Sequence, residues 1–501
     1  MTKSRTILSV LLAGLSFAGS SAQAAQPDPP SRFECGGELE SAVWRRWDSD
    51  GKRLLESLVS DRLVKQGDTY ALYDFEIYFH NLLSMAQRCR RIDRQTEFAS
   101  WISKTYAQLS ATRGRDSSLE WVCRGGSVCN DRNRLVNKEV MLTSVQFLAL
   151  AMSAANGLDR SSAAAEHKAF IAETSRIAIH HLQRWNDSNA RRSLQRRVAA
   201  KASDVKDGSS ALFLSDKDIW QLVIYAELAG VLAQHPEFEK ELRADSSDFA
   251  PMREHVKLLL ELFKARTSLM TVKDPAGRST ATVADLDRGF WRLYVDNRYA
   301  AYNDKKPPLR CTSNVSESGR QKMQVLVEAQ SLQPAETVGW DISHARRLVH
   351  FFDAIERNRQ PMQALYGAGQ DILPDGKVVA SFARQLRTTV WNQDTKHPLF
   401  TNYYSGANGW YRVAYDNGAN RCTEGTPPFG LSGAFPTGGY ATWERWDEML
   451  GTLGRQLYEL TRSTSETDIQ FIKASYPQFS GLASGDVRAR SELMFWPTLV
   501  K

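Results

Sequence analysis

The sequence predicts an all-α fold, an α/α toroid or incomplete barrel with long aromatic- and Gly-rich loops in its C-terminal half. Apolar residues recur at three- and four-residue spacing along most of the chain, and the alternation typical of strands is scarce. About a dozen helices paired antiparallel would form a ring whose loops surround a cleft. An α-solenoid would instead need a sequence repeat of roughly 20 to 50 residues, and none is present.

The helices predicted before residue 270 follow one another closely. Asp216 is a candidate N-cap, and Asn156 with Gly157 is a candidate helix end. The predicted helices cover residues 54–64, 73–109, 139–155, 163–185, 216–242 and 252–263.

Beyond residue 270 the predicted helices are separated by longer connections rich in Gly, Pro and aromatic residues. We find no linker that divides the chain, so residues 25–501 are expected to form a single toroid domain. The later helices are predicted at residues 283–302, 319–330, 343–357, 378–391, 442–461 and 466–476.

Residues 1–24 have the features of a signal peptide. Lys3 and Arg5 precede an apolar run at residues 7–18, and Ala22-Gln23-Ala24 resembles a cleavage site. A run of about 12 apolar residues is shorter than the roughly 20 that a membrane span needs. We therefore expect a periplasmic or secreted protein with no stable membrane insertion after cleavage.

The cysteine count agrees with export. An even number in an exported chain favours disulfides, and a zinc site lacks both a CxxC pair and a His at ligand spacing. We expect no metal, and no cofactor motif is present. The expected pairs are Cys35 with Cys89, Cys123 with Cys129, and Cys311 with Cys422.

The charge of the chain is mildly positive. Loss of Lys3 and Arg5 with the signal peptide lowers the formal charge from +7 to +5. This excess is compatible with an anionic polysaccharide as partner. Nucleic-acid binding is not expected, because the basic residues are scattered and no recognition motif accompanies them. The sequence makes no prediction of oligomeric state.

Residues 340–446 concentrate Trp, Tyr, Arg, His, Asn and Gly. Polar-tipped aromatic residues beside glycines are typical of a cleft that stacks a polar ligand. An exported, helix-rich chain with such loops resembles the α/α-toroid carbohydrate-active proteins, which include polysaccharide lyases and glycosidases. The resemblance is architectural, and it implies carbohydrate chemistry without assigning any residue.

A lyase acting on a uronic-acid polymer by β-elimination is the favoured function. It needs a Tyr or His base, and Asn or Arg donors for the developing negative charge. His344 is predicted in a first helical turn, where an imidazole stays neutral. The candidate catalytic residues are His344, Tyr404, Arg412 and Asn402. The candidate substrate-binding residues are Tyr403, Trp410, Tyr415, Trp291, Arg292, Trp340 and Tyr440.

Two other functions stay open. A glycoside hydrolase would need two facing carboxyl groups, and a periplasmic scaffold would bind polysaccharide without cleaving it. Any of the aromatic candidates could equally be a core residue. The carboxyl candidates are Asp74, Glu76, Asp341, Asp416, Glu424, Glu444 and Asp447.

Overall fold

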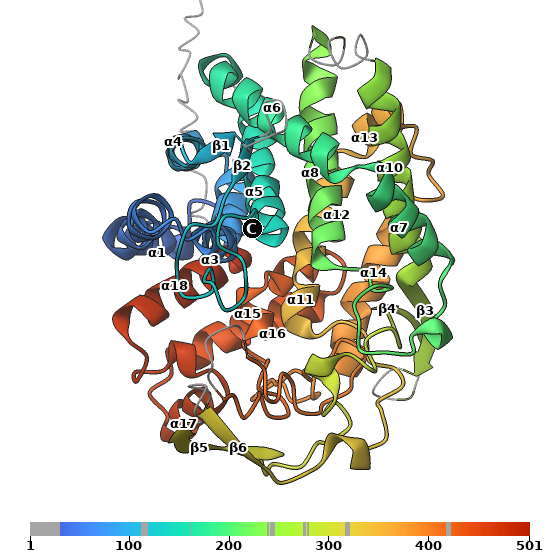
Figure 1. Ribbon diagram of the computed structural model, residues 1–501. Coiled ribbons are helices and arrows are strands. Elements are labelled where there is room, and N and C mark those ends of the chain that lie inside the picture. Colours follow the sequence, from blue (N-terminus) through green and yellow to red (C-terminus); the bar gives the residue numbers. More distant parts are fainter. Residues whose placement is uncertain are drawn as a thin grey trace, which may run out of the picture.

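The computed structural model describes residues 31–501, apart from residues 112–118, 162, 238–239, 241–245, 274–276, 278–279, 316–320 and 417–421. The predicted signal peptide therefore lies outside the described residues. The described chain is rich in helices (Figure 1), and its strands form three separate two-stranded antiparallel sheets. The expectation of a helical protein is confirmed, but the three hairpins were not predicted.

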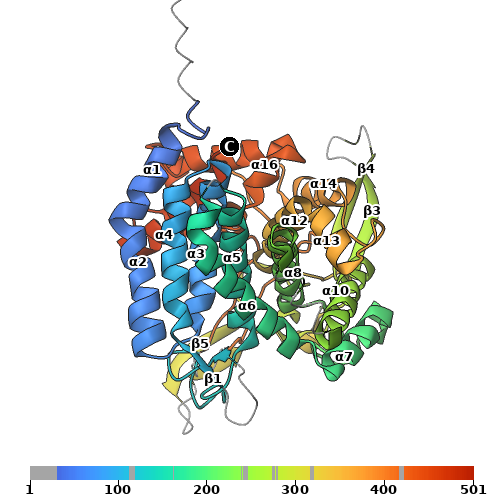
Figure 2. The same cartoon turned by 90° about the horizontal axis from the view of Figure 1, so that it is seen from above.

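Four helices form the centre of the molecule. They are α3 (Tyr70–Arg88), α5 (Met141–Asp159), α8 (Asp216–Gln234) and α12 (Arg347–Arg357). Neighbours in this series pack against one another, as Figure 2 shows from above. The C-terminal parts of α3, α5 and α12 line one cavity, and the first turns of α3, α8 and α12 meet at Arg347, so the four helices run in the same direction. We call them the central helices.

Further helices cover the central ones. Residues 38–65 form one long helical run, α4 packs on α3 and α5, and α18 packs on the other side of α3. The bounds are α1 (Glu38–Arg46), α2 (Lys52–Glu56), α4 (Ile92–Tyr106), α6 (Lys168–Trp185), α7 (Ser188–Ala199), α10 (Ser246–Arg266), α11 (Ile342–Ala345), α13 (Arg359–Tyr366), α14 (Gly376–Gln385), α15 (Ala434–Thr437), α16 (Glu448–Leu460), α17 (Glu466–Ser475) and α18 (Gly485–Phe495).

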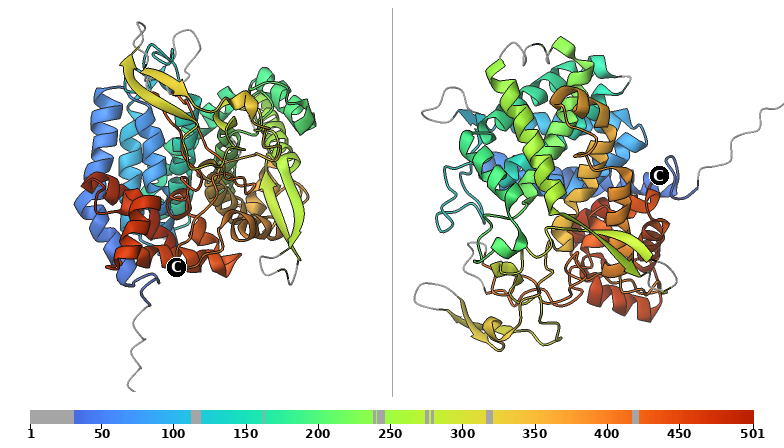
Figure 3. Two further views of the ribbon diagram at one scale, coloured as in Figure 1. Left: turned by 90° about the horizontal axis from the view of Figure 1, so that it is seen from below. Right: turned by 90° about the vertical axis from the view of Figure 1, so that its right-hand side faces the viewer.

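The strands lie at the periphery. The views in Figure 3 place the β3–β4 and β5–β6 hairpins on different sides of the molecule. Each hairpin is antiparallel, and a register shift interrupts β5–β6. The bounds are β1 (Leu109–Ala111), β2 (Leu119–Trp121), β3 (Thr267–Lys273), β4 (Thr280–Leu286), β5 (Leu309–Val315) and β6 (Gln321–Val325).

Two predicted helices are wrong. Residues 283–302 continue strand β4 and then a loop, because Asp287 (φ 56°) and Gly289 (φ 79°) have left-handed backbone that a helix does not allow. Within residues 319–330, the described part contains strand β6, which pairs with β5, and a short 3₁₀ turn at Ala329–Ser331. In both places pairing with a neighbouring strand outweighs the local helical spacing.

Other boundaries also differ from the prediction. Residues 73–109 form two helices and the start of a short strand. The left-handed backbone of Arg90 (φ 52°) interrupts the helix between α3 and α4. Residues 442–461 form a 3₁₀ turn at Tyr440–Arg445 followed by α16. The prediction omitted α1, α7, α13, α15 and α18.

One large cluster of buried apolar side chains extends from Leu39 to Val500. Helix α5 is almost wholly buried in it. By length and composition α5 is the one described helix that could span a membrane, but 83% of its most apolar stretch is buried inside the protein. It therefore has the burial of a core helix.

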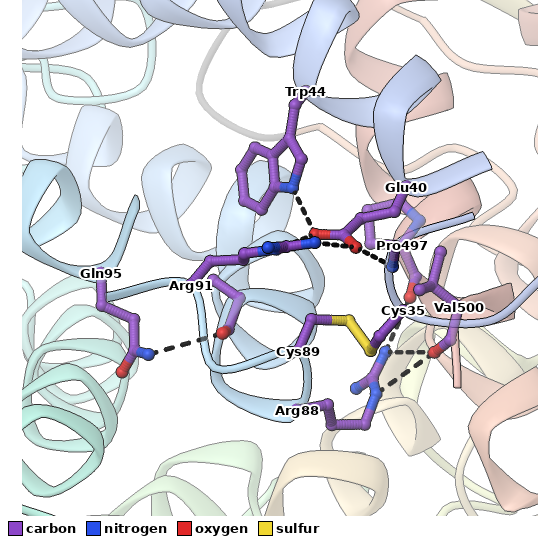
Figure 4. The surroundings of a disulfide bond; sticks show 11 residues. Cys35, Glu40, Trp44, Arg88, Cys89, Arg91, Gln95, Pro497 and Val500 are labelled. Atoms are coloured by element: carbon purple, nitrogen blue, oxygen red, sulfur yellow. Dashed lines mark hydrogen bonds and ion pairs between the residues drawn. A yellow bond between two sulfur atoms is a disulfide. The ribbon is translucent and has the colours of Figure 1, made fainter. Parts of the chain in front are cut away.

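The six cysteines form the three expected disulfides. The Cα atoms of Cys35 and Cys89 are 5.3 Å apart, those of Cys123 and Cys129 are 6.0 Å apart, and those of Cys311 and Cys422 are 5.6 Å apart. Disulfides of this kind agree with an oxidising environment. Figure 4 shows the surroundings of Cys35–Cys89, where Arg88 reaches the carbonyl groups of Pro497 and Val500 near the end of the chain.

Candidate functional site

Polar and aromatic side chains gather at the N-terminal ends of the central helices. They come from the first turns of α3, α8 and α12, from the turn before α12, and from two loops at residues 291–297 and 411–415. Their charges and hydroxyl groups interact with one another across these elements. We call this set the tyrosine–arginine cluster. It comprises Tyr70, Tyr73, Asp216, Tyr294, Asp296, Asp341, His344, Arg347, Tyr411, Arg412 and Tyr415.

Asp341 and His344 form a hydrogen-bonded pair at the centre of the cluster. Asp341 is the N-cap of α11, and its Oδ1 accepts hydrogen bonds from the backbone N–H groups of Ser343 (2.9 Å) and His344 (3.1 Å). Its Oδ2 lies 2.5 Å from Nδ1 of His344. Nδ1 is thereby held as the donor, which leaves Nε2 as the basic nitrogen.

Asp341 is ionised in this setting. Burial alone would raise the pKa of its carboxyl group, but the charge and hydrogen bond of His344, the hydroxyl of Ser343 and the charge of Arg412 outweigh burial and lower it strongly. The His344 side chain is 26% exposed. An imidazole with a fixed tautomer can therefore meet a ligand from solvent.

Arg412 lies in a loop with unusual backbone geometry. Arg412 (φ 55°) and Ala414 (φ 60°) both have left-handed backbone, which non-glycine residues rarely adopt and which often accompanies function. Asp296 holds this conformation, because its carbonyl accepts from the Arg412 backbone N–H (2.9 Å) and its carboxylate accepts from Nε (3.0 Å). The Arg412 side chain remains 35% exposed.

The guanidinium of Arg412 lies over two aromatic rings. Its Cζ is 5.1 Å from the ring centroid of Tyr411 and 4.5 Å from that of Tyr415, within the range of cation–π contacts. Desolvation by burial opposes the charge of Arg412, but the neighbouring tyrosines and carboxylates outweigh it and raise the pKa of the guanidinium. A fixed, partly exposed cation of this kind suits a carboxylate ligand.

Four tyrosines of the cluster, Tyr70, Tyr294, Tyr411 and Tyr415, are held in their protonated form. Burial raises the pKa of Tyr70 to about 12, with smaller contributions from Tyr415 and Tyr73. Burial also raises the pKa of Tyr294 and Tyr415. The hydroxyl of Tyr411 lies 3.4 Å from Nδ1 of His344, and its pKa is also raised. At neutral pH these phenols are hydrogen-bond donors and proton donors.

A buried polar layer lies beneath the cluster. Nη2 of Arg347 is 3.3 Å from the Tyr73 hydroxyl and 3.3 Å from the Asp216 carboxylate. One turn further along α3, the fully buried carboxylate of Glu76 accepts hydrogen bonds from Gln146 (2.6 Å) and Arg346 (3.1 Å). Glu76 also lies 3.0 Å from Nδ1 of His80. This layer separates the cluster from the opposite end of the central helices.

Glu76, His80 and His350 lie close enough together to be tested as a metal site. The two imidazole rings stack with centroids 3.5 Å apart and planes 7° apart. Lone pairs in parallel stacked rings do not converge on one ion, and both Glu76 oxygens already have partners. The geometry therefore disfavours coordination by this trio.

Several other predicted site residues are buried structural groups. The hydroxyl of Tyr404 donates to the carbonyl of Phe382 (2.7 Å), that of Tyr403 to Trp410 (3.2 Å) and that of Tyr440 to Ile342 (2.7 Å). Each of the three tyrosines is fully buried. The structure places them beneath the loops that carry the cluster.

The predicted Asn and Trp candidates have similar structural contacts. The side-chain amide of Asn402 donates to the carbonyls of Gly409 (2.9 Å) and Pro427 (2.8 Å) and accepts from the backbone of Leu431 (2.9 Å). The indole N–H of Trp340 donates to the Leu214 carbonyl, and that of Trp410 to the Asp304 carbonyl. Asn402 thus ties the later loops together.

Trp291 and Arg292 lie beside the cluster and hold its loop in place. The indole N–H of Trp291 donates to the buried carboxylate of Asp287 (2.6 Å). Arg292 donates to the carbonyls of Ala202 (2.5 Å) and Val205 (3.0 Å). Of the predicted catalytic and binding residues, the structure brings His344, Arg412 and Tyr415 together.

Asp296 and Arg347 belong to the cluster without having had a functional prediction. Asp296 is an ordinary acidic residue in the sequence, and the aromatic residues near it, such as Tyr294 and Tyr299, are the only signal there. Arg347 is almost fully buried among the N-terminal ends of the central helices, where it forms a salt bridge with Asp216. Both residues acquire their positions through contacts that are distant in sequence.

No protein-family model matches the chain, and neither the curated proteins nor the solved structures compared with it gave a match. The assignment of the site therefore rests on the geometry of this chain alone.

Proposed function

We propose that the chain is an exported, single-domain carbohydrate-active protein, an incomplete α/α toroid, that cleaves a uronic-acid polymer by β-elimination. The observation that carries the proposal is the Asp341–His344 pair beside Arg412 and Tyr415. The central helices, packed side by side with other helices outside them, support the toroid. The three disulfides support export.

In the proposed reaction His344 is the base. Its Nε2 takes the proton from the carbon next to the uronate carboxyl group, and Asp341 stabilises the imidazolium that forms. Arg412 binds the carboxylate and stabilises the negative charge that develops on it. These roles require a neutral imidazole at the moment of proton transfer and a charged guanidinium, and the tyrosines and carboxylates around Arg412 favour the charged guanidinium.

Tyr415 is the proposed acid. As the new carbon–carbon double bond forms, the glycosidic carbon–oxygen bond breaks, and the leaving oxygen takes the proton of the phenol. The raised pKa of Tyr415 keeps this proton in place until the oxygen leaves. Solvent then returns a proton to Tyr415 and removes one from His344, so no water is added to the sugar.

Hydrolysis by a carboxyl pair is the second candidate. Asp296 and Asp341 lie near each other in the cluster, and their pKa values shift in opposite directions. Burial raises the pKa of Asp296, although Arg412 opposes this, whereas that of Asp341 is lowered. One protonated and one ionised carboxyl group are the requirement for a glycosidase.

Incubation with neutral and uronic-acid polysaccharides tests the proposal. New reducing ends with ultraviolet absorbance of an unsaturated uronate are expected, and His344→Asn should abolish both. Reducing ends without absorbance, lost in Asp296→Asn, would assign hydrolysis instead. Binding without either product across the panel would favour a polysaccharide-binding scaffold.

A further inference from the structure

A second polar site lies at the opposite ends of the central helices. A cavity of about 740 Å³ is lined by the C-terminal parts of α3, α5 and α12 and by Glu227 in the middle of α8, and a second cavity of about 610 Å³ adjoins it at Arg88, Asp353 and Arg445. The larger cavity has the size of a small-molecule site. It is separate from the tyrosine–arginine cluster, because the buried layer around Glu76 lies between them.

The charges that line the larger cavity are unbalanced. Its lining contains five arginines and three carboxylates. Arg357 pairs with Glu227, and Arg445 pairs with Asp353 and Glu356. The five arginines are Arg88, Arg90, Arg160, Arg357 and Arg445.

Arg88 and Arg160 have neutral partners. Arg88 donates to the carbonyls of Pro497 (2.7 Å) and Val500 (3.2 Å), as Figure 4 shows. Arg160 donates to the side-chain oxygens of Asn156 (3.1 Å) and Asn358 (2.8 Å). Within the described residues, neither arginine forms an ion pair with a carboxylate. Both side chains are exposed to solvent, so two positive charges at this cavity are left without a carboxylate in direct contact.

The environment of these two arginines opposes their charge. Desolvation lowers the pKa of Arg88, and Arg445 adds to this effect although Asp353 opposes it. Desolvation and the charge of Arg357 likewise lower the pKa of Arg160, against Glu227. An anion in the cavity would relieve this repulsion.

Part of the arrangement has a structural explanation. Helix C-termini carry partial negative charge, and arginines placed there stabilise them. That role accounts for the hydrogen bonds to backbone carbonyls. It does not account for a cavity of this volume beside the two cations, nor for the floor of the cavity.

Buried polar groups form that floor. His80 and His350 are 2% and 5% exposed, and both line the cavity. Gln95 is also buried and lines the cavity. Its side-chain oxygen accepts no hydrogen bond from the described residues. Burial, His80 and the surrounding arginines lower the pKa of His350 well below its usual range, so this imidazole is neutral. The neutral imidazole of His350 and the amide of Gln95 can bind the hydroxyl groups of a ligand.

We propose that this cavity, the Arg88–Arg160 pocket, binds a small hydroxylated organic anion whose carboxylate or phosphate group is neutralised by Arg88 and Arg160. The site is distinct from the proposed catalytic cluster and does not depend on the lyase reaction.

Calorimetric titration of the full mature chain tests the proposal with three probes: glucuronate, inorganic phosphate and glucose as the uncharged control. At least one anion is expected to bind, and glucose is not. Binding of glucuronate alone would assign a carboxylate ligand, binding of phosphate alone a phosphate ligand, and binding of both a general oxyanion site. Absence of binding by both anions at about 10 mM, a concentration at which even a weak site of Kd near 1 mM is filled, would overturn the proposal.

Four variants locate the binding. Arg160→Gln removes one cation, and Ser84→Phe fills part of the cavity, so each should weaken binding about tenfold or more. Arg176→Gln, an exposed arginine on α6 outside the cavity, is the matched control and should bind like the unmodified chain. Circular dichroism establishes that each variant is folded.

Arg412→Gln separates this proposal from the proposed function, because it removes the cation that would bind a carboxylate at the tyrosine–arginine cluster. Anion binding to the Arg88–Arg160 pocket should persist in this variant, whether or not the chain is a lyase. If Arg412→Gln abolishes binding while Arg160→Gln and Ser84→Phe leave it unchanged, the anion binds at the tyrosine–arginine cluster and the second site is rejected.

Discussion

The two ends of the central helices neutralise their charges in different ways. At the N-terminal ends each cation faces a carboxylate, as in Arg412 with Asp296 and Arg347 with Asp216. At the C-terminal ends Arg88 and Arg160 face neutral oxygens beside a cavity. The first arrangement holds groups in fixed positions for chemistry, and the second leaves positive charge for a ligand.

This difference follows from what covers each end. Loops from the later part of the chain lie over the N-terminal ends and supply Asp296, Tyr411 and Arg412. The C-terminal ends meet the last residues of the chain, which offer backbone carbonyls to Arg88 (Figure 4). Between the two ends, the layer around Glu76 satisfies its own polar groups.

The largest expected effect is the loss of cleavage activity when the proposed base at the N-terminal end is removed. His344→Ala should lower the rate of polymer cleavage by about 10²- to 10⁴-fold, since it removes the proposed base. The initial rate of absorbance increase measures this. His397→Ala is the matched control, because His397 also lies beside an aspartate, Asp468, but outside the cluster. Equal losses in the two variants would reject the assignment of His344.

The layer between the two ends is tested by stability. Glu76→Leu leaves Arg346 and Gln146 buried without their acceptor and should lower the free energy of unfolding by about 3–5 kcal/mol. Urea unfolding measures this. Asp486→Asn, which removes an exposed partner of Arg53, should stay close to the unmodified chain. A Glu76→Leu variant of unchanged stability would mean that the layer is not a tightly paired network.

The disulfides near the two ends should differ in their contribution to stability. Cys35–Cys89 follows the C-terminal end of α3 and closes a separation of 54 residues. Cys123–Cys129 closes six residues, and its loop reaches the turn before α3 through a hydrogen bond from Arg124 to Gly67. Loop-closure entropy gives about 4 kcal/mol for the first and about 2 kcal/mol for the second. Urea unfolding of two double variants, one with both Cys35 and Cys89 replaced by Ser and one with both Cys123 and Cys129 replaced by Ser, measures these contributions. Equal losses of unfolding free energy in the two variants would contradict this order.

Acid should destabilise the folded chain through His350, the buried histidine near the C-terminal ends of the central helices. An unfolded His350 has a pKa of about 6.5, whereas burial, His80 and the nearby arginines hold its folded pKa well below this. Below pH 6.5 the unfolded chain binds a proton that the folded chain does not, so stability is full above pH 6.5 and falls as the pH drops.

The His350→Phe variant measures this contribution. It should reduce the slope of unfolding free energy against pH by up to about 1.4 kcal/mol per pH unit between pH 6.5 and 4.5. His181 and His255, whose pKa values burial lowers to about 4, account for a residual slope. An unchanged slope in the variant would show that His350 titrates normally.

The sequence predicted the central helices better than the periphery. Long buried helices such as α5 and α8 bear a continuous apolar pattern, and the predicted N-cap Asp216 lies one residue after the N-cap in the structure, Ser215. The strands β4 and β6 were read as helices because each is short and depends on a partner strand. Local spacing carries no information about that partner.

The sequence predicts which residue types form the site, but not which of their side chains point into it. Tyr404 and Tyr415 lie in one polar, aromatic segment with similar neighbours in sequence. Tyr404 points into the core, whereas Tyr415 lies against Arg412 in the cluster. The left-handed backbone of Arg412 and Ala414 turns the chain between them, and Asp296, distant in sequence, supports that turn. No pattern in the segment itself distinguishes the two tyrosines.

Replacement of Tyr404 therefore has the smallest expected effect on stability and activity, and it tests which tyrosine is the proton donor at the N-terminal site. Tyr404→Phe removes one buried hydroxyl that donates to the Phe382 carbonyl, so it should lower the free energy of unfolding by about 1 kcal/mol. Its rate of cleavage should match that of the unmodified chain, whereas Tyr415→Phe, the matched variant, should slow cleavage about 10²-fold or more. If Tyr404→Phe abolishes cleavage at unchanged stability, the proton donor is Tyr404, and the loop must rearrange to expose it when the polymer binds.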